Sequence, residues 1–504
     1  MYLGIDCGTQ GTKALLVDGA GKVLGRGYAA HALVERSSGA REQDPAAWVR
    51  ALVEATQQAL SSAVSAGIVA PGERVVAIGV SGQQHGLVVL DDTMNVIRPA
   101  KLWNDTETAP QNAELTESFG GKAAWFDRFG IVPLTGYTVS KLLWIKQHEA
   151  TNFARIRHIL LPHDYLNWWL TGEVRAEAGD ASGTAFFDNR TGTWSREILD
   201  SIDDGTGHLY RALPPLIKPV DLVGVLRPLA AETLGVSRTC VVAAGGGDNM
   251  MGAIGTGNVR EGVVTISLGT SSTVYSYSHD PVLDSTGNVA PFCSSSGGWL
   301  PLVCTMNATN VVTQTVKLLG RSVEDIETAL GETNPGADGL VFMPFLNGER
   351  TPNLPHAQGT LSGISTLNFT ASHLIRAAVE GVSFGILAGL DRILTGRPAD
   401  LIQVIGGGAR SHGWRQLLAD ATGARVVVPV EQESGCLGAA IQAHVAWNRS
   451  QGLEVSFEQA TEALITTGGE RTEMPDHNRR SAYDTARERY ARVLRTTYPE
   501  AFSK

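Results

Sequence analysis

Asp248 directly follows three glycines, at residues 245–247, and an apolar run at residues 240–243. The apolar run predicts a buried strand, and the small residues after Asp248 predict the start of a helix. Open α/β sheets bind ligands at such strand–loop–helix junctions, where a carboxylate suits a general base. Aspartate is also a favoured helix N-cap, because its carboxylate accepts hydrogen bonds from the first N–H groups of a helix. The loop alone therefore leaves two interpretations of Asp248, a catalytic base and a helix cap.

A second carboxylate, Asp6, follows a predicted strand at residues 2–5 and begins a loop rich in glycine and threonine. Glycines let backbone N–H groups approach phosphate oxygens, and hydroxyls add further donors. Asp6 suits a water-mediated Mg²⁺ site, because Mg²⁺ binds few carboxylates and keeps several waters. The loop lacks the Walker A spacing, and a plain hairpin turn is the alternative. The candidate phosphate-binding residues here are Gly8, Thr9, Gln10, Thr12 and Lys13.

Two further glycine-rich loops lie in the second half of the chain. The loop after the strand predicted at residues 263–268 repeats the glycine–threonine pattern of the first loop, and the pair predicts a two-sided phosphate clamp. The loop after the strand predicted at residues 401–405 leaves a flat glycine surface for an adenine ring. A β-turn and close strand–helix packing are the respective alternatives. The candidate nucleotide contacts are Gly269 and Thr270 in one loop, and Gly407, Gly408 and Ala409 in the other.

Polar residues also end two predicted strands of the first half, at residues 75–80 and 99–105. They offer amide, imidazole, indole and carboxylate groups. That set suits a polyhydroxylated ligand, whose hydroxyls need donors and acceptors and whose C–H faces pack on a ring. A solvated loop histidine is the simpler alternative for the imidazole. The candidate sugar contacts are Gln84, His85, Trp103 and Asp105.

The elements that carry these loops follow an alternating strand and helix pattern. Three short strands open the chain, and Asp44-Pro45 then begins a helix, with Asp as N-cap and Pro in the first turn. Residues 136–235 are mostly helical, and residues 373–394 form a long amphipathic helix. The glycine–threonine loop that occurs once in each half indicates two related domains. We expect an α/β protein with an N-terminal domain at residues 1–242 and a C-terminal domain at residues 243–504.

The composition is that of a globular protein and limits the partners. The 504 residues carry a formal charge of −10, and no long basic block indicates a nucleic-acid surface. Five cysteines without metal-ligand spacing suggest a reducing compartment. The chain begins with a strand pattern rather than a signal peptide, and no apolar run approaches the length of a membrane span. We therefore expect a cytoplasmic protein without nucleic-acid or membrane partners.

Taken together, these loops resemble those of the FGGY carbohydrate kinases. The resemblance covers nearly the whole chain, and the order and spacing of the motifs agree with that family. Two longer stretches, at residues 136–146 and 359–380, also fit its signatures. The loops that carry the resemblance lie at residues 6–13, 245–249, 269–271 and 406–411.

The resemblance implies two ribonuclease-H-like domains of the actin/hexokinase superfamily, with the site in the cleft between them. It implies that Asp248 is the catalytic base and that Asp6 is needed for Mg²⁺ and ATP. Gln84, His85 and Asn249 would then contact a ketose. Family habit and the small-residue stretch at residues 438–440 suggest a homodimer.

Within the family, the sugar loop and its neighbours look most like members that phosphorylate D-xylulose to D-xylulose 5-phosphate. The similar stretches include residues 82–86, 102–105 and 161–166. One departure is Gln84, where bacterial relatives often carry methionine. The prediction of D-xylulose as substrate is therefore separate from, and more specific than, the prediction of kinase activity.

Three other functions compete with this one. A different FGGY kinase would act on ribulose, fuculose, gluconate or glycerol. An actin-like or chaperone-type ATPase would turn over ATP without sugar and switch a binding surface, but the polar cluster around His85 and Trp103 argues against it. A catalytically dead sugar sensor is disfavoured because both Asp6 and Asp248 are present.

Overall fold

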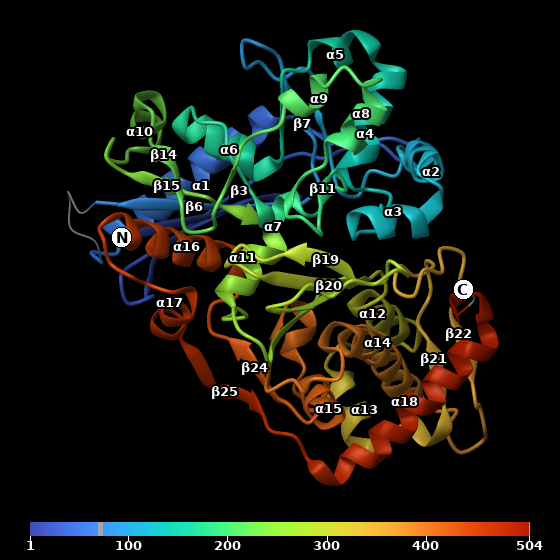
Figure 1. The fold of residues 1–504 in the computed structure, drawn as a ribbon. Coiled ribbons are helices and arrows are strands. Elements are labelled where there is room, and N and C mark those ends of the chain that lie inside the picture. The colour runs from blue at the N-terminus through green and yellow to red at the C-terminus, as the bar shows by residue number, and fades with distance from the viewer. Residues whose placement is uncertain (69–73, 503–504) are drawn as a thin grey trace. The chain divides into compact units, whose positions relative to one another are not determined.

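The computed structural model describes residues 1–68 and 74–502, and these divide into two compact units. Unit 1 comprises residues 1–259, 278–300 and 433–465, and unit 2 comprises residues 260–277, 301–432 and 466–504. Each unit is built on its own mixed sheet with helices packed against it (Figure 1). We describe the two units separately.

The main sheet of unit 1 has the order β14-β15-β6-β1-β2-β3. Its central strand β1 pairs antiparallel with β2 and parallel with β6. The short strand β16 also pairs with β6, beyond the end of β15. The strands are β1 (Tyr2–Cys7), β2 (Gly11–Val17), β3 (Val23–Ala30), β6 (Ala77–Gly82), β14 (Leu222–Val225), β15 (Val241–Ala243) and β16 (Gly246–Gly247).

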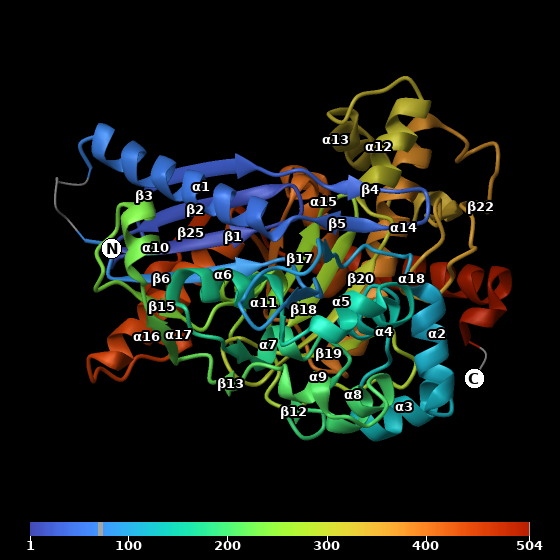
Figure 2. The same cartoon turned by 90° about the horizontal axis from the view of Figure 1, so that it is seen from above.

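Two helices cover the two faces of this sheet. Helix α1 (Pro45–Ser65) lies along β2 and β3, and helix α16 (Ser434–Ser450) packs on β1 and β6 (Figure 2). Side chains alternate along a strand, so Leu3, Ile5 and Cys7 join the core beside α1, whereas Tyr2 joins the core beside α16. The same alternation turns Asp6 toward α16, and a Cβ on Gly435 would lie 2.9 Å from its carboxylate.

Short helices and strands make up the rest of unit 1. The strand expected over residues 99–105 is limited to β8, because the chain turns at Leu102 and the Asp105 N–H donates to its carbonyl. The helices are α2 (Ala109–Ser118), α3 (Gly121–Phe129), α4 (Thr138–His148), α5 (Ala150–Arg155), α6 (Pro162–Thr171), α7 (Ala178–Ala181), α8 (Arg196–Ile202), α9 (His208–Arg211), α10 (Pro228–Leu234), α11 (Asp248–Gly255) and α17 (Phe457–Leu464). The short strands include β4 (Val34–Glu35), β5 (Arg41–Gln43), β7 (Val88–Leu90), β8 (Ala100–Lys101) and β9 (His158–Leu160).

The sheet of unit 2 repeats the pairing pattern of unit 1. Its strands β20-β18-β17-β23-β24-β25 follow one another, with β17 antiparallel to β18 and parallel to β23. The hairpins β1–β2 and β17–β18 thus occupy the same place in two similar sheets, which confirms the predicted duplication. The strands are β17 (Val263–Leu268), β18 (Ser272–Ser276), β20 (Trp299–Thr305), β23 (Leu401–Ile405), β24 (Arg425–Pro429) and β25 (Thr467–Glu473). The longer helices are α12 (Thr309–Leu318), α13 (Asp325–Glu332), α14 (Ala371–Leu394), α15 (His412–Thr422) and α18 (His477–Thr497).

The units do not divide the chain at residue 242 as the sequence suggested. Unit 1 continues through α11 to Val259 and takes back α16 and α17 from the last third of the chain. The reason is close packing between two glycine-bearing helices: a Cβ on Gly438 would lie 1.8 Å from the Met251 carbonyl oxygen, and one on Gly255 would lie 2.0 Å from that of Ser434. Small residues at 438–440 therefore serve packing inside unit 1.

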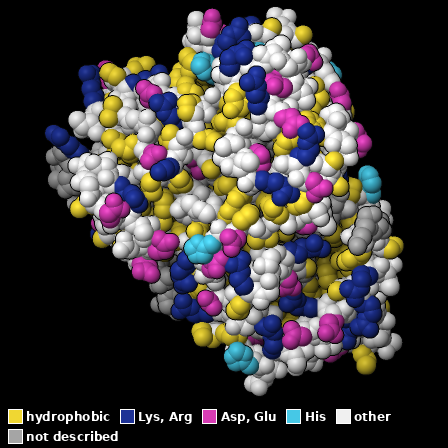
Figure 3. Space-filling model, in the orientation of Figure 1, with side chains coloured by type: hydrophobic (Ala, Val, Ile, Leu, Met, Phe, Trp, Pro, Cys, Tyr) yellow, Lys and Arg dark blue, Asp and Glu magenta, His cyan; other side chains and the backbone are white. Residues whose placement is uncertain are grey.

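Helix α14 agrees with the long helix predicted at residues 373–394, but it is also long and apolar enough to cross a membrane, which the sequence interpretation did not note. By length and composition it could cross a membrane, but 78% of its most apolar window is buried inside the protein. The core helix of a globular protein can have the same length and composition, so these two properties are weak evidence for a membrane span. None of the five cysteines forms a disulfide within the described part of the chain. On the face in Figure 3, acidic side chains lie among basic ones.

Candidate active site

Asp248 is the first residue of α11, and the N-cap position belongs to Gly247. Its Oδ1 accepts hydrogen bonds from the backbone N–H (2.8 Å) and from Nδ2 (3.0 Å) of Asn249, whereas Oδ2 accepts none from the described residues. The side chain is partly exposed. One oxygen is thus held in place and the other is available, which is the arrangement that a base needs. Asp248 does not occupy the N-cap position itself, although its Oδ1 accepts from the first-turn N–H of Asn249.

The surroundings of Asp248 favour a proton on its carboxyl group. Burial raises the pKa of Asp248 to about 7, and the negative charges of Asp6 and Asp180 add to the rise. The hydrogen bonds from Asn249 act in the opposite direction. A carboxyl group with a pKa near neutrality is well suited to accept and release protons at pH 7.

The register of three strands brings Asp6 close to Asp248. Asp6 pairs with Ser81 between β1 and β6, and Ser81 pairs with Gly246 between β6 and β16. Neighbouring strands lie about 4.8 Å apart, so the backbone of Asp6 is about 10 Å from that of Gly246, two residues before Asp248. Asp6 Oδ1 accepts a hydrogen bond of 2.6 Å from Ser81 Oγ, and burial raises its pKa.

The glycine loop before Asp248 is fixed by helix α16. Gly245 has a φ of +77°, which suits glycine, and its N–H donates to Gln442 Oε1 at 2.7 Å. Gln442 Nε2 in turn donates to the Gly245 carbonyl at 3.0 Å. A single buried amide thereby holds both backbone groups of the residue at which the chain turns toward Asp248.

The first glycine–threonine loop is a tight turn between β1 and β2, closed by a hydrogen bond from Gly8 N to the Gly11 carbonyl. Gln10 is exposed at its tip, and Lys13 is partly exposed. Lys13 Nζ donates to Glu433 Oε2 at 2.5 Å. Thr12 is fully buried, so its hydroxyl does not face solvent in this structure.

Thr9 connects the phosphate loop to the sugar loop. Its hydroxyl donates to Gln83 Oε1 at 3.1 Å and accepts from Trp103 Nε1 at 3.0 Å. Gln83 is fully buried, and its Nε2 donates to Gln43 Oε1. Trp103 keeps 39% of its surface exposed. The indole predicted to face a sugar therefore lies directly beside the predicted phosphate loop.

Gln84 and His85 follow the end of β6, and Gln84 is linked to Asp248 through Asn249. Gln84 is buried, and its Oε1 accepts a hydrogen bond of 2.9 Å from Asn249 Nδ2. His85 has a φ of +63°, and its ring lies against Tyr137 and Phe292, with ring centroids 4.6 and 5.7 Å apart. The structure thus brings together three predicted residues, Gln84, Asp248 and Asn249, and His85 follows Gln84 in the chain.

Asp105 does not join this group. It is fully buried, and its Oδ2 lies 3.1 Å from Lys101 Nζ and accepts from the Arg41 backbone N–H. Lys101 also pairs with Glu107 and lies 4.0 Å from the centre of the Trp144 ring. Asp105 is thus a member of a buried ion-pair cluster, and we do not carry it forward as a sugar contact.

Unit 2 carries the other two predicted loops. Gly269 N donates to the Ser271 carbonyl, and Thr309 Oγ1 donates to the Gly269 carbonyl at 2.7 Å. In the second loop, a Cβ on Gly408 would lie 2.8 Å from the Leu268 Cβ, whereas one on Gly407 would meet nothing within 4 Å. Close packing thus explains Gly408, and Gly407 leaves the open surface that an adenine contact requires.

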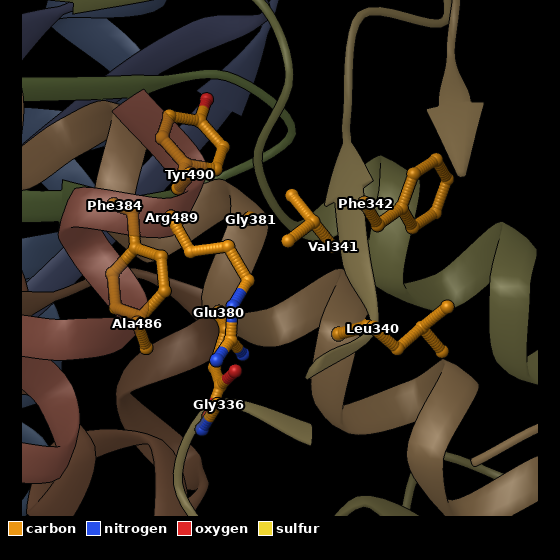
Figure 4. A pocket seen from close by; sticks show the side chains of 11 residues that line it. Gly336, Leu340, Val341, Phe342, Glu380, Gly381, Phe384, Ala486, Arg489 and Tyr490 are labelled. Atoms are coloured by element: carbon orange, nitrogen blue, oxygen red, sulfur yellow. The ribbon is translucent and has the colours of Figure 1, made fainter. Parts of the chain in front are cut away.

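A small hollow in unit 2, with an empty volume of about 230 Å³, includes none of the predicted site residues. Glu380 and Arg489 lie side by side in it, near Gly336 (Figure 4). Burial raises the pKa of Glu380 to about 7, although its Oε1 accepts hydrogen bonds from Arg376 and from the Gly336 N–H. These contacts tie α14 to the preceding loop, which is a structural role.

Lys141 holds the loop that contains His85, and the sequence interpretation did not select it. Its Nζ donates to the His85 carbonyl at 2.5 Å and to the Gly136 carbonyl at 2.8 Å. It is fully buried, and burial lowers its pKa to about 7. A lysine among the apolar residues Val139, Leu142 and Leu143 was the available signal, because lysine is rarely buried without a partner.

Comparison with known proteins agrees with this geometry. The model of the FGGY carbohydrate kinase N-terminal domain matches residues 1–255, and that of the C-terminal domain matches residues 264–447. The chain belongs to the FGGY family of carbohydrate kinases. FGGY membership confirms the expected actin/hexokinase-like fold of each half and the expected class of enzyme.

Several FGGY relatives carry the same name. The chain is 44% identical to a xylulose kinase of Haemophilus influenzae, over 99% of this chain and 100% of the relative, and 33% identical to that of Escherichia coli, over 99% of both. It is also similar to the crystal structure of xylulose kinase from Bifidobacterium adolescentis (TM-score 0.82, 33% identity, 96% and 99% coverage). A further similar structure is xylulose kinase from Rhodospirillum rubrum (TM-score 0.87, 26% identity, full coverage of both).

Proposed function

We propose that this chain transfers the γ-phosphoryl group of ATP to D-xylulose and forms D-xylulose 5-phosphate. The observation that carries the proposal is the strand register that brings two carboxylates close together. Asp6 on β1 and Gly246 on β16, two residues before Asp248, both pair with Ser81 of the intervening strand β6. The sugar-loop residue Gln84 is linked to Asp248 through Asn249. Membership of a carbohydrate kinase family and the names of the most similar relatives support the same reaction.

Asp248 acts as the general base. Its Oδ2 accepts the proton of the terminal sugar hydroxyl as that oxygen forms a bond to the γ-phosphorus. The bond between the γ-phosphorus and the bridging oxygen breaks, and ADP leaves. Because Asn249 holds Oδ1, the carboxylate does not have to reorient during the reaction.

Asp6 is suited to a water-mediated Mg²⁺ ion. Ser81 fixes its Oδ1, and its Oδ2 accepts no hydrogen bond from the described residues. A single available carboxylate oxygen fits an ion that keeps most of its waters. When bound, Mg²⁺ neutralises charge on the transferring phosphates. No cluster of three or more acidic, histidine or cysteine ligands occurs in the described part of the chain, which agrees with a site of this open kind.

The nucleotide contacts follow from the accessible loop groups. In unit 1 we assign phosphate contacts to Lys13 and to backbone N–H groups at residues 8–10, and the buried hydroxyl of Thr12 is excluded from that role. In unit 2 we assign a phosphate contact to Gly269 and Thr270. The adenine contact belongs to residues 407–409, where Gly407 leaves open surface.

The ketose contacts are His85, Trp103 and Asn249. The indole of Trp103 provides an apolar face for sugar C–H groups, and the His85 ring is oriented by Tyr137. We do not assign a direct sugar contact to Gln84, because its side chain is buried and accepts a hydrogen bond from the Asn249 amide. The presence of glutamine at position 84, where bacterial relatives often carry methionine, therefore affects sugar binding through Asn249.

We further propose a cytoplasmic homodimer. The absence of disulfides among the described residues supports a reducing compartment. Residues 438–440 no longer support a dimer, since they pack inside unit 1. Three exposed apolar side chains of unit 2 do support self-association: Ile364, Leu367 and Phe369, which are 52%, 82% and 60% exposed. Light scattering of the purified protein, which gives its molar mass, tests this directly.

ADP release with and without sugar tests the function. We expect rapid release with D-xylulose, and release at least about a hundredfold slower with water alone. Ribulose, fuculose, gluconate and glycerol form the comparison panel. A higher kcat/KM for one of these sugars would reassign the substrate, and sugar-independent release would favour the ATPase switch.

A further inference from the structure

A buried charged cluster lies next to the catalytic loop. His163, on α6, has its Nδ1 2.8 Å from Asp180 Oδ2 and its Nε2 3.0 Å from Asp164 Oδ1. The three residues are at most 1% exposed. The two carboxylates raise the pKa of His163 well above its usual value, against the effect of burial. An imidazolium held between two carboxylates is a costly arrangement to bury, and such clusters often serve function rather than stability.

The glycine loop before Asp248 packs directly on this cluster. A Cβ on Gly245 would lie 3.0 Å from His163 Cδ2, and one on Gly247 would lie 3.1 Å from Asp180 Oδ1. The Gly247 Cβ would also lie 2.7 Å from Gln84 Cγ. The loop can therefore approach the cluster only because these residues lack side chains.

A chain of contacts leads from the cluster to the base. Gln84 Nε2 and Asp180 Oδ1 are both buried, and neither makes a hydrogen bond with standard geometry among the described residues. They lie beside each other across Gly247. Burial raises the pKa of Asp180, and the interaction with the Gln84 amide acts in the opposite direction. Gln84 Oε1 then accepts from Asn249 Nδ2, which also donates to Asp248 Oδ1.

The backbone of Asp180 is fixed by hydrogen bonds to the Glu177 carboxylate. Its backbone N–H and that of Gly179 donate to the two oxygens of Glu177, at 2.6 and 2.7 Å, and cap the short helix α7. Ser295 Oγ donates to the same Glu177 carboxylate at 3.0 Å. The carboxylate of Asp180 therefore has a fixed position relative to Gln84.

We propose that His163 and Asp180 are positioning residues for the base. His163 orients the Asp180 carboxylate, which orients the Gln84 amide; that amide fixes Asn249, and Asn249 fixes Asp248 Oδ1. Neither His163 nor Asp180 touches the substrate. This proposal depends on the role proposed above for Asp248.

Steady-state kinetics of two variants test the proposal. We expect Asp180→Asn and His163→Leu to lower kcat about 10- to 100-fold, because the base loses its orientation, while KM for MgATP changes less than about threefold. His163→Asn keeps a donor near the Nδ1 position and should recover a substantial part of kcat. Asp203→Asn is the matched control, since Asp203 is also buried in unit 1 but accepts from the Leu209 N–H instead.

A double-mutant cycle separates positioning from general damage. If Asp180 acts only through Asp248, adding Asp180→Asn to Asp248→Ala lowers the residual kcat less than about twofold further. Equal losses in both backgrounds would overturn the proposal, as would a kcat within about twofold of the wild type for Asp180→Asn. Thermal unfolding of each variant shows whether that variant folds. If His163→Leu does not fold, the kcat of Asp180→Asn tests the positioning role, because this substitution keeps the side-chain volume.

The outcomes also separate this proposal from the proposed function. Near-normal turnover of Asp248→Ala would contradict the assignment of Asp248 as the base, and with it the proposed function of this residue. Loss of turnover in Asp248→Ala together with a wild-type kcat in Asp180→Asn would contradict only the positioning role of Asp180.

Discussion

Lys13 Nζ and Glu433 Oε2 lie 2.5 Å apart, although 420 positions separate the two residues in the chain. Both side chains are partly exposed, at 42% and 33%. The contact joins the phosphate loop to the N-terminus of α16 and lies near Asp6, whose pKa both charges influence. If Lys13 contacts nucleotide phosphate as proposed above, Glu433 competes with that phosphate for the lysine.

Substitutions at this pair should change ATP binding in opposite directions. Lys13→Met removes a charge-assisted hydrogen bond to phosphate, so we expect KM for MgATP to rise about tenfold or more. Glu433→Gln releases Lys13 and should lower the same KM. Initial rates at saturating D-xylulose give both values. A rise in KM for both variants would show that Glu433 positions the lysine rather than competes for it.

Asp248→Asn should lower kcat by about a thousandfold or more, because the variant keeps the shape of the side chain but accepts no proton. The folded state should persist, since Asn249 can still donate to the remaining oxygen. The measurements are kcat in the ADP-release assay and the midpoint of thermal unfolding. Turnover within about tenfold of the wild type would exclude Asp248 as the base.

The pH dependence of kcat/KM should show an acidic limb near pH 7. Burial and the charges of Asp6 and Asp180 raise the pKa of Asp248 to about 7 in the free enzyme. A base acts only when it is deprotonated, so kcat/KM falls about tenfold for each pH unit below that pKa. A profile measured from pH 5 to 9 gives the limb. A flat profile down to pH 5 would contradict this assignment.

Gly438→Ala should destabilise unit 1 and reduce activity together. The new Cβ would lie 1.8 Å from the Met251 carbonyl oxygen, so α11 must move, and α11 begins with Asp248. We expect a loss of about 1–3 kcal/mol or more in the free energy of unfolding, with a lower kcat. Gly331→Ala is the control, because its Cβ meets nothing within 4 Å on α13 and should stabilise that helix slightly. Equal stability of the two variants would contradict the packing argument.

Much of the local structure could be predicted because it depends on neighbouring residues. Alternation places Leu3 and Ile5 on one face and Asp6 on the other, and the glycine–threonine turns in both halves follow from residue type. The position of Asp248 after a strand was predictable for the same reason. Its place as first helical residue rather than N-cap was not, because the cap position depends on the φ and ψ of Gly247.

The errors concern residues whose environment comes from distant segments. Asp105 looked like a sugar contact at a strand end, but Lys101 and the Arg41 backbone enclose it. The predicted boundary at residue 242 failed because α16, nearly 200 residues later, packs against α11. Lys141 and His163 carried no assigned role, since their partners at residues 85 and 180 are far away in sequence.

The sequence by itself determined the family, the duplicated hairpins and the candidate residues for the chemistry, because these depend on residue type and local spacing. Only the tertiary structure decided which of those residues meet. Strand register sets Ser81 between Asp6 and Gly246, and Gln84 reaches Asn249 across 165 positions. Such contacts arise from the packing of whole elements, which no short stretch of sequence specifies.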